Sequence, residues 1–319
     1  MKKIIAPVSR KRILEELTYE KFVRKTNNGG NELYIVNYVN SPMIMREIGR
    51  LREISFRAAG GGTGKEIDID EFDTSEYPYQ QLIVWDPDAR EILGGYRFIL
   101  GQGPDGKEMI PEMLATSEMF RFSDQFIREY LPLTIELGRS FVQPDYQSTA
   151  RSRKSLYALD NLWDGLGALV VMNPHVKYFF GKVTMYPHFN RKARNMILHF
   201  LNEHFPDPDK LITPIKPVRI EVDEKEVSEF FSGETFRDNY KILSQKVRAL
   251  GENIPPLFNA YINLSDSLRV FGTAVNKSFG NVEETAMMVT IPDIYPSKVE
   301  RHISTFDLDK DERVREDDQ

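Results

Sequence analysis

The chain has 319 residues, with 42 Lys+Arg against 48 Asp+Glu and no cysteine. Without cysteine there is no disulfide framework, no thiolate nucleophile and no iron–sulfur or zinc–thiolate site. A hydrophobic content of 41% indicates a folded chain, and no apolar run approaches the roughly 18–20 residues of a membrane-spanning helix. We therefore expect a cytoplasmic protein, with peripheral contact at the inner face of the membrane as an alternative.

The charge of −6 is unevenly distributed. Residues 146–202 contain eight basic and two acidic residues, a net +6, whereas residues 307–319 have a net charge of −4. A basic block within an acidic chain favours binding of a specific anion over nucleic acid. The alternative is a solvated helix face. The acidic end, residues 306–319, is expected to be a disordered tail.

Strands and helices follow one another from residue 33 onward. Residues 33–39 predict a strand, and Ser41-Pro42 begins a helix that continues to about residue 59. A glycine-rich loop at residues 60–64 follows. Further along we expect a strand pair at 80–85 and 92–100, helical structure over 111–129, a strand at 133–142, a helix from about 155, a strand at 176–183 and a helix at 190–205.

Pro206-Asp207-Pro208-Asp209 marks a break, after which a polar helix (234–250), a short helix and two strand-like runs (268–274 and 286–291) follow. This order predicts an α/β (α+β) protein whose mixed sheet is flanked by helices. The expected organisation is an N-terminal arm (1–32), a core (33–211), a C-terminal α/β extension completing the fold (212–305) and the tail (306–319).

Familiar catalytic motifs are missing from the sequence. The glycine-rich stretch 59–65 has neither the first glycine nor the Ser/Thr of a phosphate-binding P-loop, so we interpret it as a flexible loop. None of the five histidines forms an HExxH motif, and we predict no metal site. A GxSxG nucleophile elbow and a GxGxxG dinucleotide fingerprint are also absent.

Four short pieces carry the candidate chemistry. Each has a plain structural alternative, such as a surface helix residue, a helix cap or a strand-end ion pair. Read in order they form Arg-x-x-x-Phe, Asp-x-x-Asp, Gly-x-x-Arg and Glu-x-x-Arg, supplied here by Arg52 and Phe56, Asp70 and Asp73, Gly94 and Arg97, and Glu136 and Arg139.

This ordered set resembles the acyl-homoserine-lactone synthases and the acyl-carrier-protein-dependent amino-acid N-acyltransferases. The second group includes the ornithine and glycine lipid synthases, often labelled hemolysin-like. Residues 162–166 (Leu-Trp-Asp-Gly-Leu), 178–181 and 254–261 add likeness to the lipid-synthase branch. Two departures disfavour a homoserine-lactone product: the glycine-rich residues 60–64 lie where those synthases have a tryptophan, and Gly138 stands where they usually have Ser.

The resemblance implies a GNAT fold, in which an acyl thioester lies between two splayed strands. The usual acetyl-CoA pyrophosphate loop is absent, and Arg151, Arg153 and Lys154 precede the matching helix. A helix N-terminus with adjacent cations suits the single phosphate of 4′-phosphopantetheine. The expected donor is therefore an acyl thioester on acyl carrier protein, with acyl-CoA as the alternative and no permanently bound cofactor. The basic block would meet the acidic carrier.

The same resemblance suggests roles for the site residues. Glu136 is the candidate base for the acceptor ammonium, with a pKa raised by burial. Backbone N–H groups near Phe141 and Val142 would hold the oxyanion. Arg97 and Arg139 would orient the site or bind the acceptor carboxylate. Four residues are expected to bind the acceptor amino acid. Asp70 and Asp73 would position its ammonium group, Arg52 would hold the loop that carries them, and Phe56 would lie beside them.

The predicted reaction transfers a long fatty acyl chain, with or without a 3-hydroxyl group, to the amino group of glycine or ornithine for aminolipid biosynthesis. One alternative is an acetyl-CoA-dependent GNAT acetyltransferase, which the missing pyrophosphate loop disfavours. The other is a non-catalytic, pore-forming hemolysin-like protein, which no amphipathic membrane-active segment supports.

Overall fold

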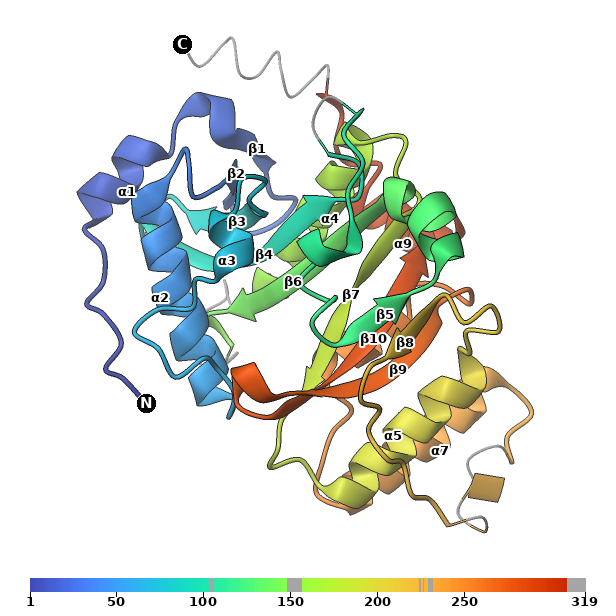
Figure 1. The fold of residues 1–319 in the computed structure, drawn as a ribbon. Helices are drawn as coiled ribbons and strands as arrows, with labels where there is room; N and C mark the ends of the chain where they lie inside the picture. Colours follow the sequence, from blue (N-terminus) through green and yellow to red (C-terminus); the bar gives the residue numbers. More distant parts are fainter. Residues whose placement is uncertain (104–105, 148–156, 224, 226, 229–231, 309–319) are drawn as a thin grey trace.

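The computed structural model describes residues 1–103, 106–147, 157–223, 225, 227–228 and 232–308. Its centre is an eight-stranded sheet in the order β1-β2-β3-β4-β6-β7-β10-β9, and β5 and β8 form a separate pair (Figure 1). The strands are β1 Phe22–Lys25, β2 Glu32–Val36, β3 Gln80–Asp86, β4 Glu91–Leu100, β5 Phe120–Phe122, β6 Thr134–Val142, β7 Tyr178–Met185, β8 Ile212–Pro214, β9 Arg269–Asn276 and β10 Val282–Thr290.

Neighbouring strands of the large sheet are antiparallel, except that β6 and β7 run parallel. The predicted mixed, mostly antiparallel sheet flanked by helices is therefore confirmed. β9 and β10 come from the C-terminal extension and extend the sheet beyond β7, and β1 comes from the N-terminal arm. The extension thus belongs to the same sheet as the core and positions one wall of the site described below.

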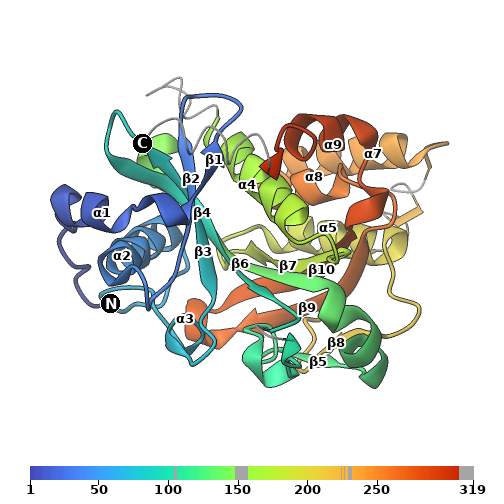
Figure 2. The same cartoon turned by 90° about the horizontal axis from the view of Figure 1, so that it is seen from above.

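Helices cover both faces of the sheet (Figure 2). Along β3, side chains alternate between two separate cores: Leu82 and Val84 pack toward α4, and Ile83 and Trp85 toward α2. Among the described residues the helices are α1 Arg10–Glu16, α2 Pro42–Ala58, α3 Glu71–Thr74, α4 Ala158–Met172, α5 Arg191–His204, α7 Phe236–Ala249, α8 Pro256–Ile262 and α9 Pro296–His302.

The face that carries α2 has two apolar clusters rather than one. The first joins α1 and α2 to β2 and β3, and the second joins the β5–β8 pair to β7, β9 and β10. The buried charges of the candidate site come from the elements between these two clusters. The opposite face has a single large core under α4, α5, α7 and α8.

Local sequence explains the helix that leads into the site. Pro42 occupies the first turn of α2, and Ile44, Ile48 and Leu51 bury one face. The helix ends just before Gly60, whose φ of +93° suits glycine. This geometry brings the last turn of α2, with Arg52 and Phe56, to the sheet.

One predicted element is wrong. Residues 111–129 were expected to be mainly helical, but they contain a short 3₁₀ turn, strand β5 and a π-helical turn at Phe126–Tyr130. Phe120 and Phe122 lie on either side of the exposed Arg121, and β5 pairs with β8, which lies 90 to 94 positions further along the chain. This long-range pairing, which local sequence does not report, overrides helix propensity. Within the described part of the chain, no helix is long and apolar enough to cross a membrane.

Candidate active site

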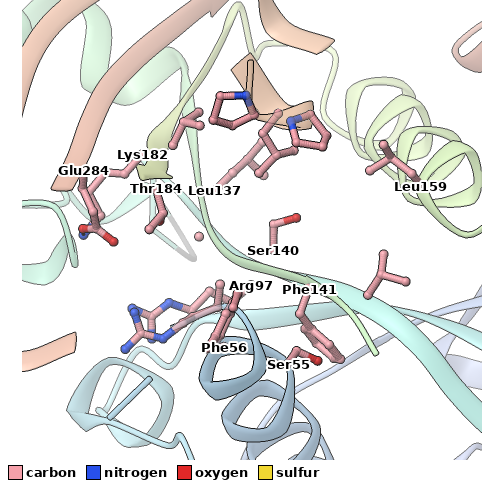
Figure 3. Close-up of a pocket in the computed structure, with 18 of the residues that line it drawn as sticks. Ser55, Phe56, Arg97, Leu137, Ser140, Phe141, Leu159, Lys182, Thr184 and Glu284 are labelled. Carbon is pink, nitrogen blue, oxygen red and sulfur yellow. The ribbon is translucent and has the colours of Figure 1, made fainter. Parts of the chain in front are cut away.

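Strands β6 and β7 separate partway along their length. Their parallel pairing ends at Leu137 opposite Gly181, after which β6 continues along β4 to Val142 and β7 continues along β10 to Met185. A cavity of about 500 Å³ lies at this opening. In Figure 3, Lys182, Thr184 and Glu284 form one wall of the cavity, and Arg97 and Phe56 lie on the opposite wall. The predicted splay of two central strands is therefore present.

A bulge in β6 shapes the cavity. Gly95 pairs with Phe141 and Arg97 pairs with Gly138, so β6 has an extra residue between these pairs. Arg139 lies in the bulge with a φ of +47°, a left-handed conformation that is unfavourable for a residue other than glycine. Both Arg139 and its neighbours on β6 line the cavity.

The glycine of the Gly-x-x-Arg motif has a steric reason. A Cβ built on Gly94 would lie 2.4 Å from the carbonyl oxygen of Phe141. Only glycine therefore allows β4 and β6 to approach this closely beside the opening.

The backbone of β6 presents polar groups to the opening. The N–H of Gln143 donates to the carbonyl oxygen of Leu93 on β4 at 2.9 Å. Because N–H directions alternate along a strand, the Val142 N–H points away from β4, toward the opening. The Val142 carbonyl accepts a hydrogen bond from Gln147 Nε2 at 2.6 Å, which agrees with this direction.

Glu136 is buried, with 2% exposure, and lines the cavity. The Thr116 hydroxyl donates to Glu136 Oε2 at 2.9 Å, and the Tyr79 hydroxyl also hydrogen-bonds to the carboxyl group. Burial raises the pKa of Glu136 above its ordinary value and outweighs the charge of Lys182 and these hydroxyls, which act to lower it. The cavity is thus lined by a buried carboxyl group whose proton affinity is increased.

Lys182 and Glu284 complete this wall, and neither was predicted as a site residue. Lys182 Nζ lies 3.0 Å from Glu284 Oε2 and donates to the carbonyl oxygen of Ala115 at 3.4 Å. Asn276 Nδ2 donates to the same oxygen of Glu284 at 3.2 Å. Burial acts to raise the pKa of Glu284, but the Lys182 ammonium and these hydrogen bonds lower it overall. Glu284 is therefore a carboxylate.

The motif arginines and aspartates form a buried charge network. Arg97 pairs with Asp70 at 2.7 Å and with Asp73 at 3.5 Å. Arg139 pairs with Asp70 at 3.3 Å and with Asp68 at 2.8 Å. Three arginines, Arg52 included, thus face three aspartates. Asp68, two residues before Asp70, is a member that the sequence motif did not reveal.

Arg52 anchors the network from α2. Its guanidinium is fully buried, lies 3.0 Å from Asp73 Oδ2 and donates to Gln81 Oε1 and to the carbonyl oxygen of Asp68. Gln81 Nε2 in turn donates to Asp73 Oδ1 at 3.0 Å. These contacts hold the segment that leads into α3.

Asp70 and Asp73 also cap α3. The Asp73 N–H donates to the Asp70 side chain and the Asp70 N–H donates to the Asp73 side chain, a reciprocal capping box. Burial acts to raise the pKa of Asp70, but Arg97 and Arg139 lower it well below its ordinary value. Neither aspartate is among the residues that line the cavity, and nor is Arg52. Asp70 and Asp73 instead pair with Arg97, and Asp70 also with Arg139, and both arginines line the cavity.

Of the other predicted residues, Phe56, Phe141 and Val142 line the cavity. Phe56 packs edge-to-face on Phe279, with ring centroids 5.0 Å apart, and the Arg139 guanidinium lies 4.3 Å from the same Phe279 ring. The predicted phosphate-binding residues 151, 153 and 154 lie outside the described part of the chain. Among the residues described, no group of three or more His, Asp or Glu side chains is arranged to hold a metal ion.

The other half of the cavity is apolar. It is lined by side chains of β6, β7, α4 and α8, including Leu137, Val142, Leu159, Val183 and Leu257. A small second hollow shares Leu137 and Val183 with this cavity as lining residues and is lined further by Phe179, Tyr261, Met287 and Val289. The cavity therefore joins a charged compartment to an apolar one across the opening between β6 and β7.

Comparison with known proteins agrees with this geometry. A protein of Phocaeicola vulgatus described as glycine N(alpha)-acyltransferase is 56% identical over 306 residues, which cover 96% of this chain and 94% of that protein. A protein of Bacteroides thetaiotaomicron with the same description is also 56% identical, over 96% of this chain and 91% of its own length. The chain belongs to this family of amino-acid N-acyltransferases. This membership is incompatible with the non-catalytic alternative.

Domain and structure comparisons concern the fold of the enzyme. The acetyltransferase (GNAT) domain matches residues 51–156, and the core has a GNAT-like fold. The N-acyl amino acid synthase FeeM from uncultured soil microbes is 10% identical with a TM-score of 0.39, covering 87% of this chain and 98% of FeeM. The CoA-dependent acyl-homoserine lactone synthase BjaI is 12% identical with a TM-score of 0.37, and the match covers 85% of this chain and 87% of the BjaI chain.

Proposed function

We propose that the enzyme transfers a long fatty acyl chain from an acyl thioester to the α-amino group of glycine. The observation that carries this proposal is the position of Glu136: a buried carboxyl group with a raised pKa, lining a cavity where two strands open toward an apolar compartment. The description of the relatives supports glycine as the acceptor. Ornithine is the alternative acceptor.

In the proposed reaction, Glu136 removes a proton from the acceptor ammonium, directly or through one water molecule. The free amine attacks the thioester carbonyl carbon. We assign the resulting oxyanion to the backbone N–H groups at the Phe141–Val142 segment, of which Val142 N–H is directed toward the opening. The C–S bond then breaks and the amide forms. Of the two protons that the nitrogen loses, the leaving thiolate takes one, and Glu136 releases the other to solvent.

The charge network has a supporting part in this scheme. Arg97 and Arg139 line the cavity while being held by Asp68, Asp70 and Asp73. Guanidinium groups fixed in this way keep their orientation when substrate binds. We assign them the orienting role, and we assign Asp70 and Asp73 an indirect role in placing the acceptor.

The donor is proposed to be acyl carrier protein, bound through the phosphate of its 4′-phosphopantetheine at Arg151, Arg153 and Lys154. An apolar compartment lined by Leu137, Leu159 and neighbouring side chains suits a long chain better than an acetyl group. An acyl-carrier donor would place the reaction in the cytoplasm, with the amphiphilic product leaving at the inner membrane face for aminolipid synthesis.

A substrate matrix tests the proposal. Purified enzyme is incubated with 3-hydroxyacyl or unsubstituted long-chain acyl groups on acyl carrier protein, with the same acyl-CoA, or with acetyl-CoA, each with glycine or ornithine. Mass spectrometry should detect N-acyl glycine from the long-chain thioesters. Product from acetyl-CoA alone would contradict the long-chain proposal, and acylation of ornithine but not glycine would contradict the acceptor.

A further inference from the structure

Lys182 is placed to meet a substrate at the strand opening. It follows Gly181, the last residue of β7 paired with β6, and its side chain lines the cavity with 11% exposure. In the parallel register Glu136 pairs with Phe180, and Lys182 comes two residues later. Since side chains alternate along a strand, Glu136 and Lys182 project from the same face, about 7 Å apart along the strand direction.

The described neighbours of Lys182 hold its ammonium group in place and leave one of its N–H donors for a ligand. An ammonium group has three N–H donors. The described residues provide Lys182 Nζ with two partners, Glu284 at 3.0 Å and the carbonyl oxygen of Ala115 at 3.4 Å. By contrast, Arg97 and Arg139 each pair with two aspartates. Among the cavity cations of the described residues, Lys182 thus has one carboxylate ion-pair partner where each arginine has two.

The charges match a small zwitterion. Glu136 has a raised proton affinity, while Lys182 is a cation held by the carboxylate of Glu284. An α-amino acid presents an ammonium and a carboxylate one carbon apart, so the two ends can reach Glu136 and Lys182 together. A carboxylate that bonds a buried ammonium gains a charge-assisted hydrogen bond.

We propose that Lys182 forms the subsite for the acceptor's α-carboxylate, with Glu284 as the residue that positions it. This inference rests on the proposed function and extends it. The acceptor amine then lies at Glu136, facing the thioester across the opening. The subsite selects amines that carry an α-carboxylate and discriminates against amines that lack one.

The test compares glycine with glycinamide, which retains the amine but has no carboxylate. With the full-length enzyme and one acyl thioester donor, kcat/KM is measured for both acceptors. Because Lys182 also lowers the pKa of Glu136, its loss affects both acceptors, so the readout is the preference between them. We expect Lys182→Met to lower the ratio of kcat/KM for glycine to that for glycinamide by about 10–100-fold, the effect of losing a charge-assisted hydrogen bond. Lys177→Met, an exposed lysine just before β7, is the matched control and should change neither.

A second variant guards against misfolding. Removing Lys182 alone leaves Glu284 buried without its cation, whereas Lys182→Met with Glu284→Gln removes both charges. We expect the double variant to show the same loss of preference for glycine. Equal losses for both acceptors, or an unchanged preference, would overturn the inference. A wild-type enzyme that acylates no glycine would instead overturn the proposed function, and the inference with it.

Discussion

Replacing Arg52 by methionine should destabilise the whole fold. Arg52 is fully buried. Without its guanidinium group, Asp73 loses its ion-pair partner on α2 and Gln81 Oε1 loses its hydrogen-bond donor. Breaking a buried, hydrogen-bonded pair by deleting one partner costs about 3–5 kcal/mol. With an unfolding entropy of about 2.1 cal/mol/K per residue, that loss lowers the Tm of a chain this size by about 5–8 °C.

The assay is thermal and urea denaturation of wild type, Arg52→Met, Asp73→Asn and the double variant. The two single changes remove partners of one contact, so their effects should be less than additive. Arg10→Met is the matched control, because Arg10 is 60% exposed and pairs with Glu91 at the surface. It should cost less than about 1 kcal/mol. If Arg52→Met costs no more than Arg10→Met, the network does not hold the site together.

Three further outcomes are expected. Glu136→Gln should lower kcat by about 10²–10⁴-fold, and wild-type activity should rise with pH through the raised pKa of Glu136. The Tm of the wild type should fall relative to that of the variant as the pH rises from the ordinary glutamate pKa to this raised pKa, because over that interval the carboxyl group ionises in the unfolded chain and stays protonated in the folded one. Gly94→Ala should cost about 1–3 kcal/mol in urea denaturation and lower kcat, since its Cβ would meet the carbonyl oxygen of Phe141; unchanged activity would contradict the close-approach argument. Arg153→Glu with Lys154→Glu should weaken binding of acyl carrier protein in titrations, with retained affinity as the refuting result.

Much of the fold follows from local sequence patterns. The N-terminal signal at Ser41-Pro42 predicts α2, which spans Pro42–Ala58, and the strand pair around residues 80–100 appears as β3 and β4. Asn190 caps α5 by accepting hydrogen bonds from the N–H groups of Lys192 and Ala193. Each of these elements depends on residues close together in the chain.

Contacts between distant segments could not be predicted in the same way. The charge network contains Asp68 and Gln81, which no motif spacing indicates, because their partners are set by how α2 and β3 pack. Lys182 and Glu284 lie 102 positions apart and meet only because β10 pairs with β7. Lys182, the one charged residue in the strand Tyr178–Met185, was the one local signal of this pair.

The most direct test of the central claim follows nitrogen from glycine into product. Wild type and Glu136→Gln are supplied with ¹⁵N-glycine and a long-chain acyl thioester on acyl carrier protein, and the extracted lipid is analysed by mass spectrometry. We predict ¹⁵N-labelled N-acyl glycine from the wild type and at least a hundredfold less from the variant. Absence of the labelled amide, or equal amounts from both proteins, would contradict an acyl transfer directed by Glu136 at the opening between β6 and β7.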